Sequence, residues 1–420
     1  MKIVIVGGGF AGLKLARKLN NKPGFEVVLI DRFNFHQFQP LFYQVATANL
    51  DASNISFPLR KMFQKSKNLT VHMAQVLSIQ PAEKTITTDQ GVVQYDELVL
   101  ATGADTNFFG NKQLQDNALA MKSTAQALQI RHRLISNFEQ ASQTTDKAEQ
   151  QRLLTVVITG GGPTGVELSG AVAEMRSFVL PKDYPDVDFS MMKIMLLEGL
   201  PKTLASMSEK SSEESKKYLE QLGVEVRLNT MVQDYDGKIV TLKDGTTIPS
   251  ALVIWAAGIK GNVPEGIDKE LIVKGNRITV DRHSKVTNLE NVYAVGDVAY
   301  METPKYPKGH PQVANVAISQ ADNLAENFIR MGRKSNGLYE FEYHDKGSLA
   351  TVGRNKAVVD IPKPKLHLKG FIAWFIWMAL HLFLLVGVKN RIQVFINWMD
   401  HYFTKDQSLR LIFRDTYKEV

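Results

Sequence analysis

The chain opens with a strand-like run followed at once by closely spaced glycines. The run "KIVIV" is apolar and β-branched, and Gly7, Gly9 and Gly12 follow it with the spacing G-x-G-x-x-G. The first glycine allows a tight turn, the second lets the backbone approach a pyrophosphate, and the third lets a helix pack closely on the strand. The next run, "FEVVLID", ends at Asp31, where a carboxylate can hold ribose hydroxyls. The order predicts a nucleotide-binding βαβ unit.

The same unit recurs in the middle of the chain. The run "LLTVVIT" leads into Gly160, Gly162 and Gly165, and the run "MKIMLLE" ends at Glu198. The gap between glycines and acid is long because "RSFVLPKDYPDVDFS" extends the crossover. A carboxylate at this position accepts from a free 2′-OH and repels a 2′-phosphate, which favours NADH over NADPH. The nearby Lys202 weakens that preference. Two such units predict an α/β protein with two Rossmann-like domains.

Composition narrows the classes of function. The 420 residues suffice for two or three domains, and none of them is cysteine. That excludes disulfides, thiolate-bound iron–sulfur clusters and cysteine-based zinc sites, and the nine histidines show no metal-ligand spacing, so no metal is expected. The net charge of +7 suits nucleic acid or an anionic membrane, but no nucleic-acid-binding signature accompanies it. The N-terminus lacks the pattern of a signal peptide, and we expect a mature, cytoplasmic start at Met1.

A long apolar stretch, "GFIAWFIWMALHLFLLVGVKNR", lies near the C-terminus. Residues 371–388 carry no formal charge and reach the minimum length of a membrane-spanning helix. His381 lies in the middle, however, and basic residues flank the stretch on both sides, whereas a span should show a one-sided excess. This pattern favours a helix that lies in the interface of one leaflet.

The following segment supports membrane attachment. Apolar residues recur there at helical spacing, at Ile392, Phe395, Ile396, Met399 and Phe403. Trp374, Trp377 and Trp398 suit the depth of lipid headgroups. A buried helical hairpin or a dimer interface is the alternative, and a dimer that binds membrane fits both readings.

Further motifs carry a resemblance to the two-dinucleotide flavoprotein reductases. They are "LVLATGA", "VIWAAGI" and "NVYAVGDVA", in that order relative to the two glycine patterns. The resemblance implies FAD at the first site, the nicotinamide cofactor at the second, and Asp297 on the ribityl chain. Without cysteine, a disulfide reductase or sulfide:quinone reductase is excluded, and the F-x-G-x-x-x-H signature of Baeyer–Villiger monooxygenases is absent. An iron–sulfur protein, oxygen or a quinone remains as electron acceptor, and the apolar tail favours the quinone.

Essentially the whole chain resembles the type II NADH dehydrogenases, which are single-subunit, non-pumping NADH:quinone reductases. The resemblance is carried by "DRFNFHQFQPLFYQVATANLD", "GGGPTGVELSG", "HPQVANVA" and the two-part apolar C-terminus. It implies a glutathione-reductase-like pair of Rossmann-like domains with a C-terminal helical membrane-attachment module. The family commonly has a second Gln four positions after Gln312, where this chain has Val316. That departure leaves the orientation of the quinone open.

The resemblance also implies site residues. Glu167 is expected near the nicotinamide–flavin junction and Gln312 at the flavin and quinone. Read without the family, Glu167 is either an acid favoured by a helix N-terminus or, as its place in the glycine-pattern turn favours, a residue at the nicotinamide. Gln312 read in the same way is a helix N-terminal or surface contact. The expected FAD residues are Gly7, Gly9, Phe10, Ala11, Gly12, Asp31, Arg32, Gln39, Gln44, Val76, Ala101, Thr102, Gly103, Gly296, Asp297, Gln312 and Val313. The expected NADH residues are Gly160, Gly162, Pro163, Thr164, Gly165, Val166, Glu167, Glu198, Ala257 and Gly258. The stretch 39–47 is expected to line the flavin and the quinone tunnel, with Ala46 and Thr47 joining Gln312 at the quinone.

We therefore expect an FAD domain in two parts, 1–118 and 284–345, an inserted NADH domain at 119–283, and a membrane-anchoring region at 346–420. The expected partners are a membrane quinone and the bilayer surface on the cytoplasmic face of the inner membrane; a homodimer is compatible with this and nucleic acid is not expected. Two other functions stay open. One is a soluble NADH-dependent flavin reductase that serves an iron–sulfur protein or oxygen, and the other is a non-enzymatic flavoprotein that senses NADH.

Overall fold

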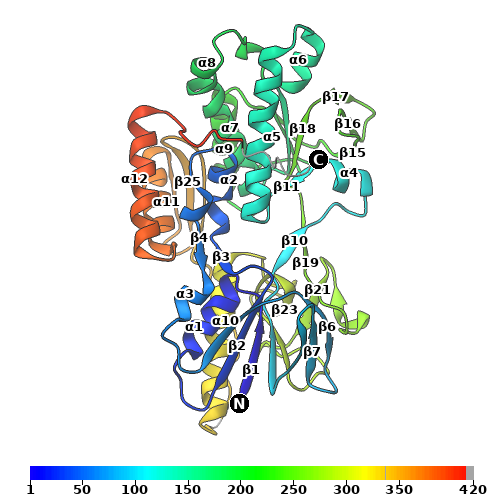
Figure 1. Cartoon of the computed structure of the whole chain (residues 1–420), viewed down its shortest axis with the longest axis vertical. Helices are drawn as coiled ribbons and strands as arrows, with labels where there is room; N and C mark the ends of the chain where they lie inside the picture. The colour runs from blue at the N-terminus through cyan, green and yellow to red at the C-terminus, as the bar shows by residue number, and fades with distance from the viewer. Residues whose placement is uncertain (336, 413–420) are drawn as a thin grey trace, which may run out of the picture. The chain divides into compact units, whose positions relative to one another are not determined.

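A computed structural model describes residues 1–335 and 337–412, which fall into two units (Figure 1). Unit 1 comprises Met1–Gln37, Phe57–Asp105 and Ile259–Asp345. Unit 2 comprises Phe38–Ser56, Thr106–Gly258 and Lys346–Val420. The domain boundaries predicted at 118/119, 283/284 and 345/346 stay a prediction.

Unit 1 is built on a five-stranded parallel sheet in the order β22-β9-β1-β2-β5. Its strands are β1 (Lys2–Val6), β2 (Glu26–Asp31), β5 (Leu69–Met73), β9 (Glu97–Leu100) and β22 (Val292–Ala294). Ile3, Val4 and Ile5 are fully buried, as expected for a parallel strand covered on both faces. Helices α1 (Phe10–Leu19) and α10 (Ala314–Gly332) pack against each other. This sheet places the first glycine pattern at the carboxyl end of β1.

Smaller elements complete unit 1. An antiparallel sheet is formed by β6 (Val76–Gln80), β7 (Thr85–Thr88) and β8 (Gly91–Gln94). A second three-stranded sheet consists of β20 (Ile272–Val273), β21 (Arg277–Val280) and β23 (Ala299–Met301). Side chains of both sheets share one apolar core with β1, β2, β9 and β22.

Unit 2 repeats the five-stranded parallel design in the order β11-β18-β12-β13-β14. Its strands are β11 (Leu119–Ala120), β12 (Thr155–Thr159), β13 (Lys193–Leu197), β14 (Glu225–Arg227) and β18 (Leu252–Trp255). Its main helices are α5 (Thr124–Gln143), α6 (Lys147–Leu153), α7 (Pro163–Phe178) and α9 (Glu209–Gln221). A small antiparallel sheet is added by β15 (Val232–Tyr235), β16 (Ile239–Leu242) and β17 (Thr247–Pro249). The second glycine pattern therefore lies at the carboxyl end of β12.

The C-terminal part of unit 2 is an antiparallel sheet followed by two helices. The strands are β24 (Ser348–Gly353), β25 (Lys356–Ile361) and β26 (Leu366–Lys369), and the helices are α11 (Gly370–Leu384) and α12 (Val388–Thr404). Strand β24 lies against α7, where a Cβ on Gly170 would stand 1.6 Å from the carbonyl oxygen of Val352. Only glycine allows this approach, which brings the C-terminal sheet onto the helix that follows the second glycine pattern.

The apolar stretch 371–388 is not one helix. Helix α11 ends at Leu384, and α12 begins at Val388 after Gly387, whose φ of 87° favours glycine. The guanidinium of Arg391 donates to the carbonyl oxygens of Leu385 and Phe383 at 2.8 and 2.7 Å, which caps the end of α11. Among the helices of the described residues, none combines the length and apolarity that a bilayer crossing needs. The predicted fold class, two Rossmann-like domains with C-terminal helices, is confirmed.

Candidate active site

The glycine loop of unit 1 leaves room for a ligand in one place only along its turn. A Cβ on Gly7, which has a φ of 109°, would stand 2.2 Å from the oxygen of Ala101, and a Cβ on Gly12 would stand 1.8 Å from the oxygen of Gly7. A Cβ on Gly9 would meet no heavy atom within 4 Å. The open space lies at the N-terminus of α1, where free amide N–H groups attract phosphate. The loop therefore fits the pyrophosphate of a dinucleotide.

The acid after β2 is fixed by this same loop. The Oδ2 atom of Asp31 accepts from the backbone N–H of Gly8 at 2.5 Å, and its Oδ1 atom accepts from that of Phe33 at 2.7 Å. Burial raises the pKa of Asp31, while the two amide N–H groups and Arg32 lower it by less. The carboxylate is held beside the glycine turn, as ribose binding requires.

The other residues predicted at FAD lie in several parts of the structure. Phe10 and Ala11 begin α1, Arg32 follows β2, and Val76 begins β6. Ala101, Thr102 and Gly103 follow β9, with the Thr102 hydroxyl donating to the oxygen of Asn262 at 2.6 Å. Gly296 and Asp297 begin the 3-10 helix after β22, and Val313 caps α10. Gln39 begins the 3-10 helix η1 (Gln39–Leu41) and Gln44 lies in α2 (Phe42–Ala46), both in unit 2.

Gln312 lies in unit 1, two residues before α10 begins. Its Nε2 atom donates to the carbonyl oxygen of Asp297 at 2.8 Å. The Gln312 amide is therefore oriented by the segment that carries the G-D motif. The roles of the predicted FAD residues stay predictions.

The glycine loop of unit 2 uses the same geometry. Gly160 has a φ of 101°, and a Cβ on Gly165 would stand 1.9 Å from the oxygen of Gly160. A Cβ on Gly162 would meet no heavy atom within 4 Å. Pro163 begins α7, and its ring needs no amide hydrogen there. The N-terminus of α7 is thus open toward a phosphate group in the way that α1 is.

Glu198, at the end of β13, mirrors Asp31. Its two carboxylate oxygens accept from the backbone N–H groups of Gly161 and of Leu200, the latter at 2.7 Å. Lys202 is engaged by Glu209, with Nζ and Oε2 2.9 Å apart. Thr164, Val166 and Glu167 of the predicted NADH residues lie in the first two turns of α7. Ala257 and Gly258 follow β18, and a Cβ on Gly160 would stand 2.9 Å from the backbone nitrogen of Ala257, so this segment lies against the loop. Their contacts with NADH stay predictions.

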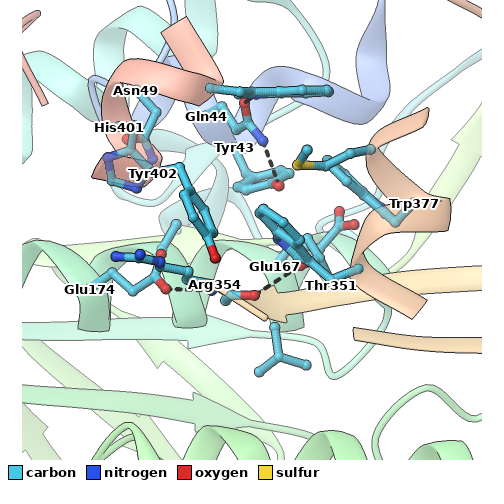
Figure 2. Close-up of a pocket in the computed structure, with 16 residues that line it drawn as sticks. Tyr43, Gln44, Asn49, Glu167, Glu174, Thr351, Arg354, Trp377, His401 and Tyr402 are labelled. Carbon is cyan, nitrogen blue, oxygen red and sulfur yellow. Dashed lines mark hydrogen bonds between the residues drawn. The ribbon is translucent and has the colours of Figure 1, made fainter. Parts of the chain in front are cut away.

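An aromatic pocket opens within unit 2 (Figure 2). It encloses about 620 Å³ outside the atoms, with solvent at its mouth included. Helices α2, α7, α11 and α12 and the β24–β25 hairpin form its wall. The aromatic pocket is lined by Tyr43, Gln44, Asn49, Glu167, Ala171, Glu174, Thr351, Val352, Gly353, Arg354, Trp374, Trp377, Met378, Trp398, His401 and Tyr402.

Glu167 lies on α7, the helix that follows the second glycine pattern, and its side chain lines this pocket. It lies in the second turn of α7 and is 9% exposed. Burial raises its pKa to about 8, whereas the neighbouring Thr351 backbone and Trp377 side chain lower it by less. At neutral pH a large share of this carboxyl group is protonated, so it can donate a hydrogen bond as well as accept one.

Tyr43, Gln44 and Trp398 form a buried chain of hydrogen bonds along one wall. The Trp398 indole N–H donates to Oε1 of Gln44 at 2.7 Å, and Nε2 of Gln44 donates to the Tyr43 hydroxyl at 2.8 Å. Burial and the charges of Glu167 and Glu174 raise the pKa of Tyr43 well above its ordinary value. The phenol stays neutral, and its own proton is free to point into the pocket.

A second set of polar groups lies at the other end of the aromatic pocket. Glu174 accepts from the backbone N–H of Arg354 at 2.5 Å, and the Arg354 guanidinium lies 4.1 Å from the ring centre of Tyr402. Burial raises the pKa of Glu174, while the Arg354 amide, His401 and Lys356 lower it by less. The pocket therefore has an aromatic middle, and α7 places one buried carboxyl group toward each end of it, Glu167 and Glu174.

Sequence reasoning found part of this pocket. Glu167 and Gln44 line it, while Ala46 and Thr47 are fully buried beside it and the Thr47 hydroxyl donates to the Tyr43 carbonyl at 2.9 Å. Gln312 belongs to unit 1. The lining residues not singled out from the sequence are Tyr43, Asn49, Ala171, Glu174, Thr351, Val352, Gly353, Arg354, Met378, His401 and Tyr402. Tyr43 lies inside the stretch 39–47 that the resemblance indicated; the others had no signal in the sequence pattern.

The placement of the tryptophans at headgroup depth is wrong for two of the three. Trp377 is 2% and Trp398 8% exposed, and both line the aromatic pocket. The Trp398 indole N–H is used by Gln44, and Trp377 stacks on His381 with ring centres 4.1 Å apart. A high content of lysine and tryptophan predicts an amphipathic surface, but it does not predict which face of the helix each tryptophan occupies.

The comparisons with known proteins cover almost all of the chain. Residues 1–321 match the family model described as pyridine nucleotide-disulphide oxidoreductase, and residues 345–405 match that of the NDH2 C-terminal domain. A type II NADH:quinone oxidoreductase of Mycobacterium tuberculosis is 35% identical over 94% of this chain and 87% of its own. One of Haemophilus influenzae is 27% identical over 90% of this chain and 92% of its own. The structure of NDH2 from Plasmodium falciparum in complex with NADH aligns with a TM-score of 0.89 at 22% identity, over 98% of this chain and 99% of that one.

The fold and the two glycine loops define the class, that of pyridine nucleotide-disulphide oxidoreductases. Within this class the chain belongs to the type II NADH:quinone oxidoreductases, as the extent and identity of the relatives show.

Proposed function

We propose that this protein transfers a hydride from NADH to FAD and then electrons to a membrane quinone, without pumping protons, in a respiratory chain. The observation that carries the proposal is the position of Glu167. It lies on α7, whose N-terminus is open for the NADH pyrophosphate, and it also lines the aromatic pocket. One helix thus connects the nicotinamide site to a pocket suited to a flat, apolar oxidant.

FAD, when bound, supplies the hydride acceptor and the store of electrons, because a flavin can take two electrons and release them to another acceptor. The residues that would hold it in unit 1 are Gly7, Gly9 and Gly12 of the loop and Asp31 after β2. The open space over Gly9 and the fixed carboxylate of Asp31 fit its pyrophosphate and ribose. In unit 2, Gly160, Gly162, Gly165 and Glu198 would hold NADH in the same way.

We assign quinone reduction to the aromatic pocket. Aromatic faces such as those of Trp374, Trp377 and Tyr402 suit stacking on a quinone ring. The quinone oxygens gain negative charge on reduction, so they need hydrogen-bond donors, and Glu167 and Tyr43 can both donate. Gln312, Ala46 and Thr47 remain predicted quinone residues.

The apolar side chains that α11 and α12 expose support membrane attachment. Phe375, Phe383 and Phe403 are 58%, 72% and 78% exposed. Others on these helices or between them are Phe371, Ile372, Val388, Ile392, Phe395 and Ile396. So large an exposed apolar surface, with Lys363, Lys365, Lys369, Lys389 and Lys405 nearby in the chain, suits the headgroups and upper acyl chains of one leaflet. We place it at the cytoplasmic face; a dimer could use part of the same surface.

The test of function is NADH oxidation by the flavin-loaded full-length protein, with a short-chain quinone, oxygen or a ferredoxin as acceptor. Rapid, saturable turnover that depends on quinone is expected. Turnover that is indifferent to quinone would instead indicate a flavin reductase for another acceptor. Flavin reduction by NADH without turnover on any acceptor would indicate a sensor.

A further inference from the structure

Quinone reduction in this pocket needs a proton from solvent in every cycle. This requirement rests on the proposed function, quinone reduction in the aromatic pocket. NADH gives up a hydride, which carries two electrons and one proton, whereas the conversion of a quinone to a quinol takes two electrons and two protons. The balance is NADH + H⁺ + quinone → NAD⁺ + quinol. Because the carboxyl and phenol groups of the pocket are buried, the additional proton needs a route from the surface.

Glu174 is a second buried carboxyl group in the aromatic pocket, and it is not among the residues assigned to NADH binding. It is 8% exposed and lines the aromatic pocket two helical turns after Glu167, about 10 Å further along the axis of α7. Tyr43 lines the same pocket as both acids, and the charge of each raises its pKa. Its hydroxyl accepts from Gln44, so its proton can be directed toward either carboxyl group.

His401 connects the aromatic pocket to a second, polar pocket in unit 2. The polar pocket includes Asn49, Asp51, Asp400, His401, Asp406 and Gln407 in its lining and encloses about 920 Å³, open solvent included. Asn49 and His401 line both pockets. The Nδ1 atom of His401 lies 2.9 Å from the carbonyl oxygen of Asp406. A carbonyl oxygen can only accept, so Nδ1 carries the hydrogen and Nε2 is the atom that can take up a proton.

Two amide side chains indicate that water enters between these pockets. The Gln407 side chain is 1% exposed, and neither its Oε1 nor its Nε2 atom has a hydrogen-bond partner among the described residues. The Oδ1 atom of Asn49 is buried and likewise unpartnered within the described part of the chain. Buried polar atoms of this kind are normally satisfied by water, and both side chains line the polar pocket. A hydrated path from the surface to His401 follows.

We propose that His401 and Glu174 form the proton path into the aromatic pocket, with His401 taking protons from the polar pocket and Glu174 delivering them toward Tyr43 and Glu167 (Figure 2). The proton enters as a hydrated proton, passes through Nε2 of His401 and the Glu174 carboxyl group, and ends on a quinone oxygen. Glu174 and His401 act through other groups and are positioning residues for proton transfer. His401 from α12, and Arg354 and Lys356 from the β24–β25 hairpin, are the neighbours whose electrostatic effect lowers the pKa of Glu174.

Glu174 also has a structural contact, and the test must separate the two roles. Its Oε1 atom accepts from the Arg354 backbone N–H, which holds the β24–β25 turn. A Glu174→Gln change keeps an oxygen for this bond but removes the exchangeable carboxyl proton. Glu213→Gln, on the exposed side of α9, is the matched control for loss of one carboxylate.

The experiment uses flavin-loaded full-length protein and two electron acceptors. A short-chain quinone takes protons with its electrons, whereas ferricyanide takes electrons alone. For Glu174→Gln we expect kcat with quinone near pH 8 to fall about tenfold and KM to stay within about twofold, with a larger solvent deuterium isotope effect. The rate with ferricyanide, and flavin reduction by NADH measured by stopped flow, should stay within about twofold of the wild type. The Glu213→Gln protein should match the wild type throughout.

His401→Ala gives an independent reading. Its quinone rate should fall in the same way and recover when imidazole is added, since imidazole can occupy the space left by the side chain. Equal losses with quinone and ferricyanide, or an unchanged quinone rate in Glu174→Gln, would overturn the proton path. A wild-type protein that reduces ferricyanide but no quinone would instead refute the proposed function itself.

Discussion

The indole N–H of Trp398 donates a 2.7 Å hydrogen bond to Oε1 of Gln44, although 354 positions separate the two residues in the chain. Asn390, on the same helix, donates to the carbonyl oxygens of Ser53 and Asn54 at 3.0 and 2.9 Å. Helix α12 is therefore part of the pocket wall and is tied to the α2 region by buried bonds. Removing it would take away both the apolar surface and one side of the site.

Trp398→Phe tests this bond directly. The change keeps an aromatic ring of similar shape but leaves the buried Oε1 atom of Gln44 without that donor. We expect the free energy of unfolding to fall by about 1–3 kcal/mol, measured by denaturant titration of the flavin-loaded protein. Trp374→Phe, at another wall of the pocket, loses no such bond and should cost less. Equal effects of the two changes would show that the bond contributes little.

Two glycine changes test the assignment of FAD to unit 1. A Cβ at Gly9 has open space, so Gly9→Ala should fold with a Tm near that of the wild-type apoprotein but bind FAD more weakly, because the methyl group lies where the pyrophosphate must approach. A Cβ at Gly12 would stand 1.8 Å from the oxygen of Gly7, so Gly12→Ala should destabilise the fold itself. The measurement is the ratio of flavin to purified protein, with thermal unfolding alongside. Full flavin content in Gly9→Ala would count against the assignment.

Glu198→Gln tests cofactor selection. The carboxylate is fixed by the Gly161 and Leu200 amides, and a neutral amide in its place neither repels a 2′-phosphate nor accepts as strongly from a 2′-OH. We expect the ratio of kcat/KM for NADH over NADPH to fall about tenfold, which corresponds to about 1.4 kcal/mol. Glu213→Gln removes an exposed acid of α9 that makes no ion pair with Lys202 and serves as the control. Unchanged selectivity would remove Glu198 from the site.

Glu167 should make stability depend on pH. Its folded-state pKa of about 8 lies above the ordinary value of 4.5, so the unfolded chain releases this proton at a lower pH than the folded protein does. Glu167 therefore contributes most to the stability of the folded protein below pH 4.5, and this contribution is lost as the pH rises through about 8. Thermal unfolding of flavin-loaded protein should show a smaller fall in Tm from about pH 5 to about pH 8.5 in Glu167→Gln than in the wild type. Parallel curves would mean that Glu167 is ionised in the folded protein throughout.

Exposed phenylalanines test the lipid surface. Phe383→Ser and Phe403→Ser remove rings that are 72% and 78% exposed. Each should reduce sedimentation with anionic liposomes by about threefold or more, since an exposed phenylalanine contributes roughly 1 kcal/mol or more of burial in lipid. Val92→Ser, at a valine that is 66% exposed in unit 1, should bind as the wild type does. Normal liposome binding together with a shift from dimer to monomer would assign the surface to a second copy of the chain.

The nucleotide loops could be predicted from the sequence because each is local. Gly7, Gly12 and Asp31 lie within one βαβ unit, and the steric reason for each glycine depends on neighbours in the same unit. The second unit obeys the same spacing despite its long crossover. The glycine pattern already favoured a nicotinamide role for Glu167, because its helical turn carries the pattern, and the family resemblance added the nicotinamide–flavin junction.

The aromatic pocket could not be predicted in this way because four distant segments build it. Tyr43, Glu174, Arg354 and His401 are brought together only when β24 packs on Gly170 of α7 and α12 folds back on the α2 region. The apolar run at 371–388 indicated an amphipathic surface, but hydropathy does not report that Gly387 breaks the helix or that the Trp398 indole faces inward. Which side of each helix is buried depends on partners that no local pattern encodes.

Asp31 and Glu198 are anchored by the same pair of backbone amides, one from the middle of the glycine turn and one two residues after the acid. Because the two turns are built alike, neither can tell a flavin from a nicotinamide by itself. Selectivity between the two cofactors must therefore come from residues beyond the turns. These are Gly296 and Asp297 in unit 1, and Glu167 with its side of α7 in unit 2. If the two glycine turns were exchanged in a chimera, we would expect FAD still to bind unit 1 and NADH still to bind unit 2.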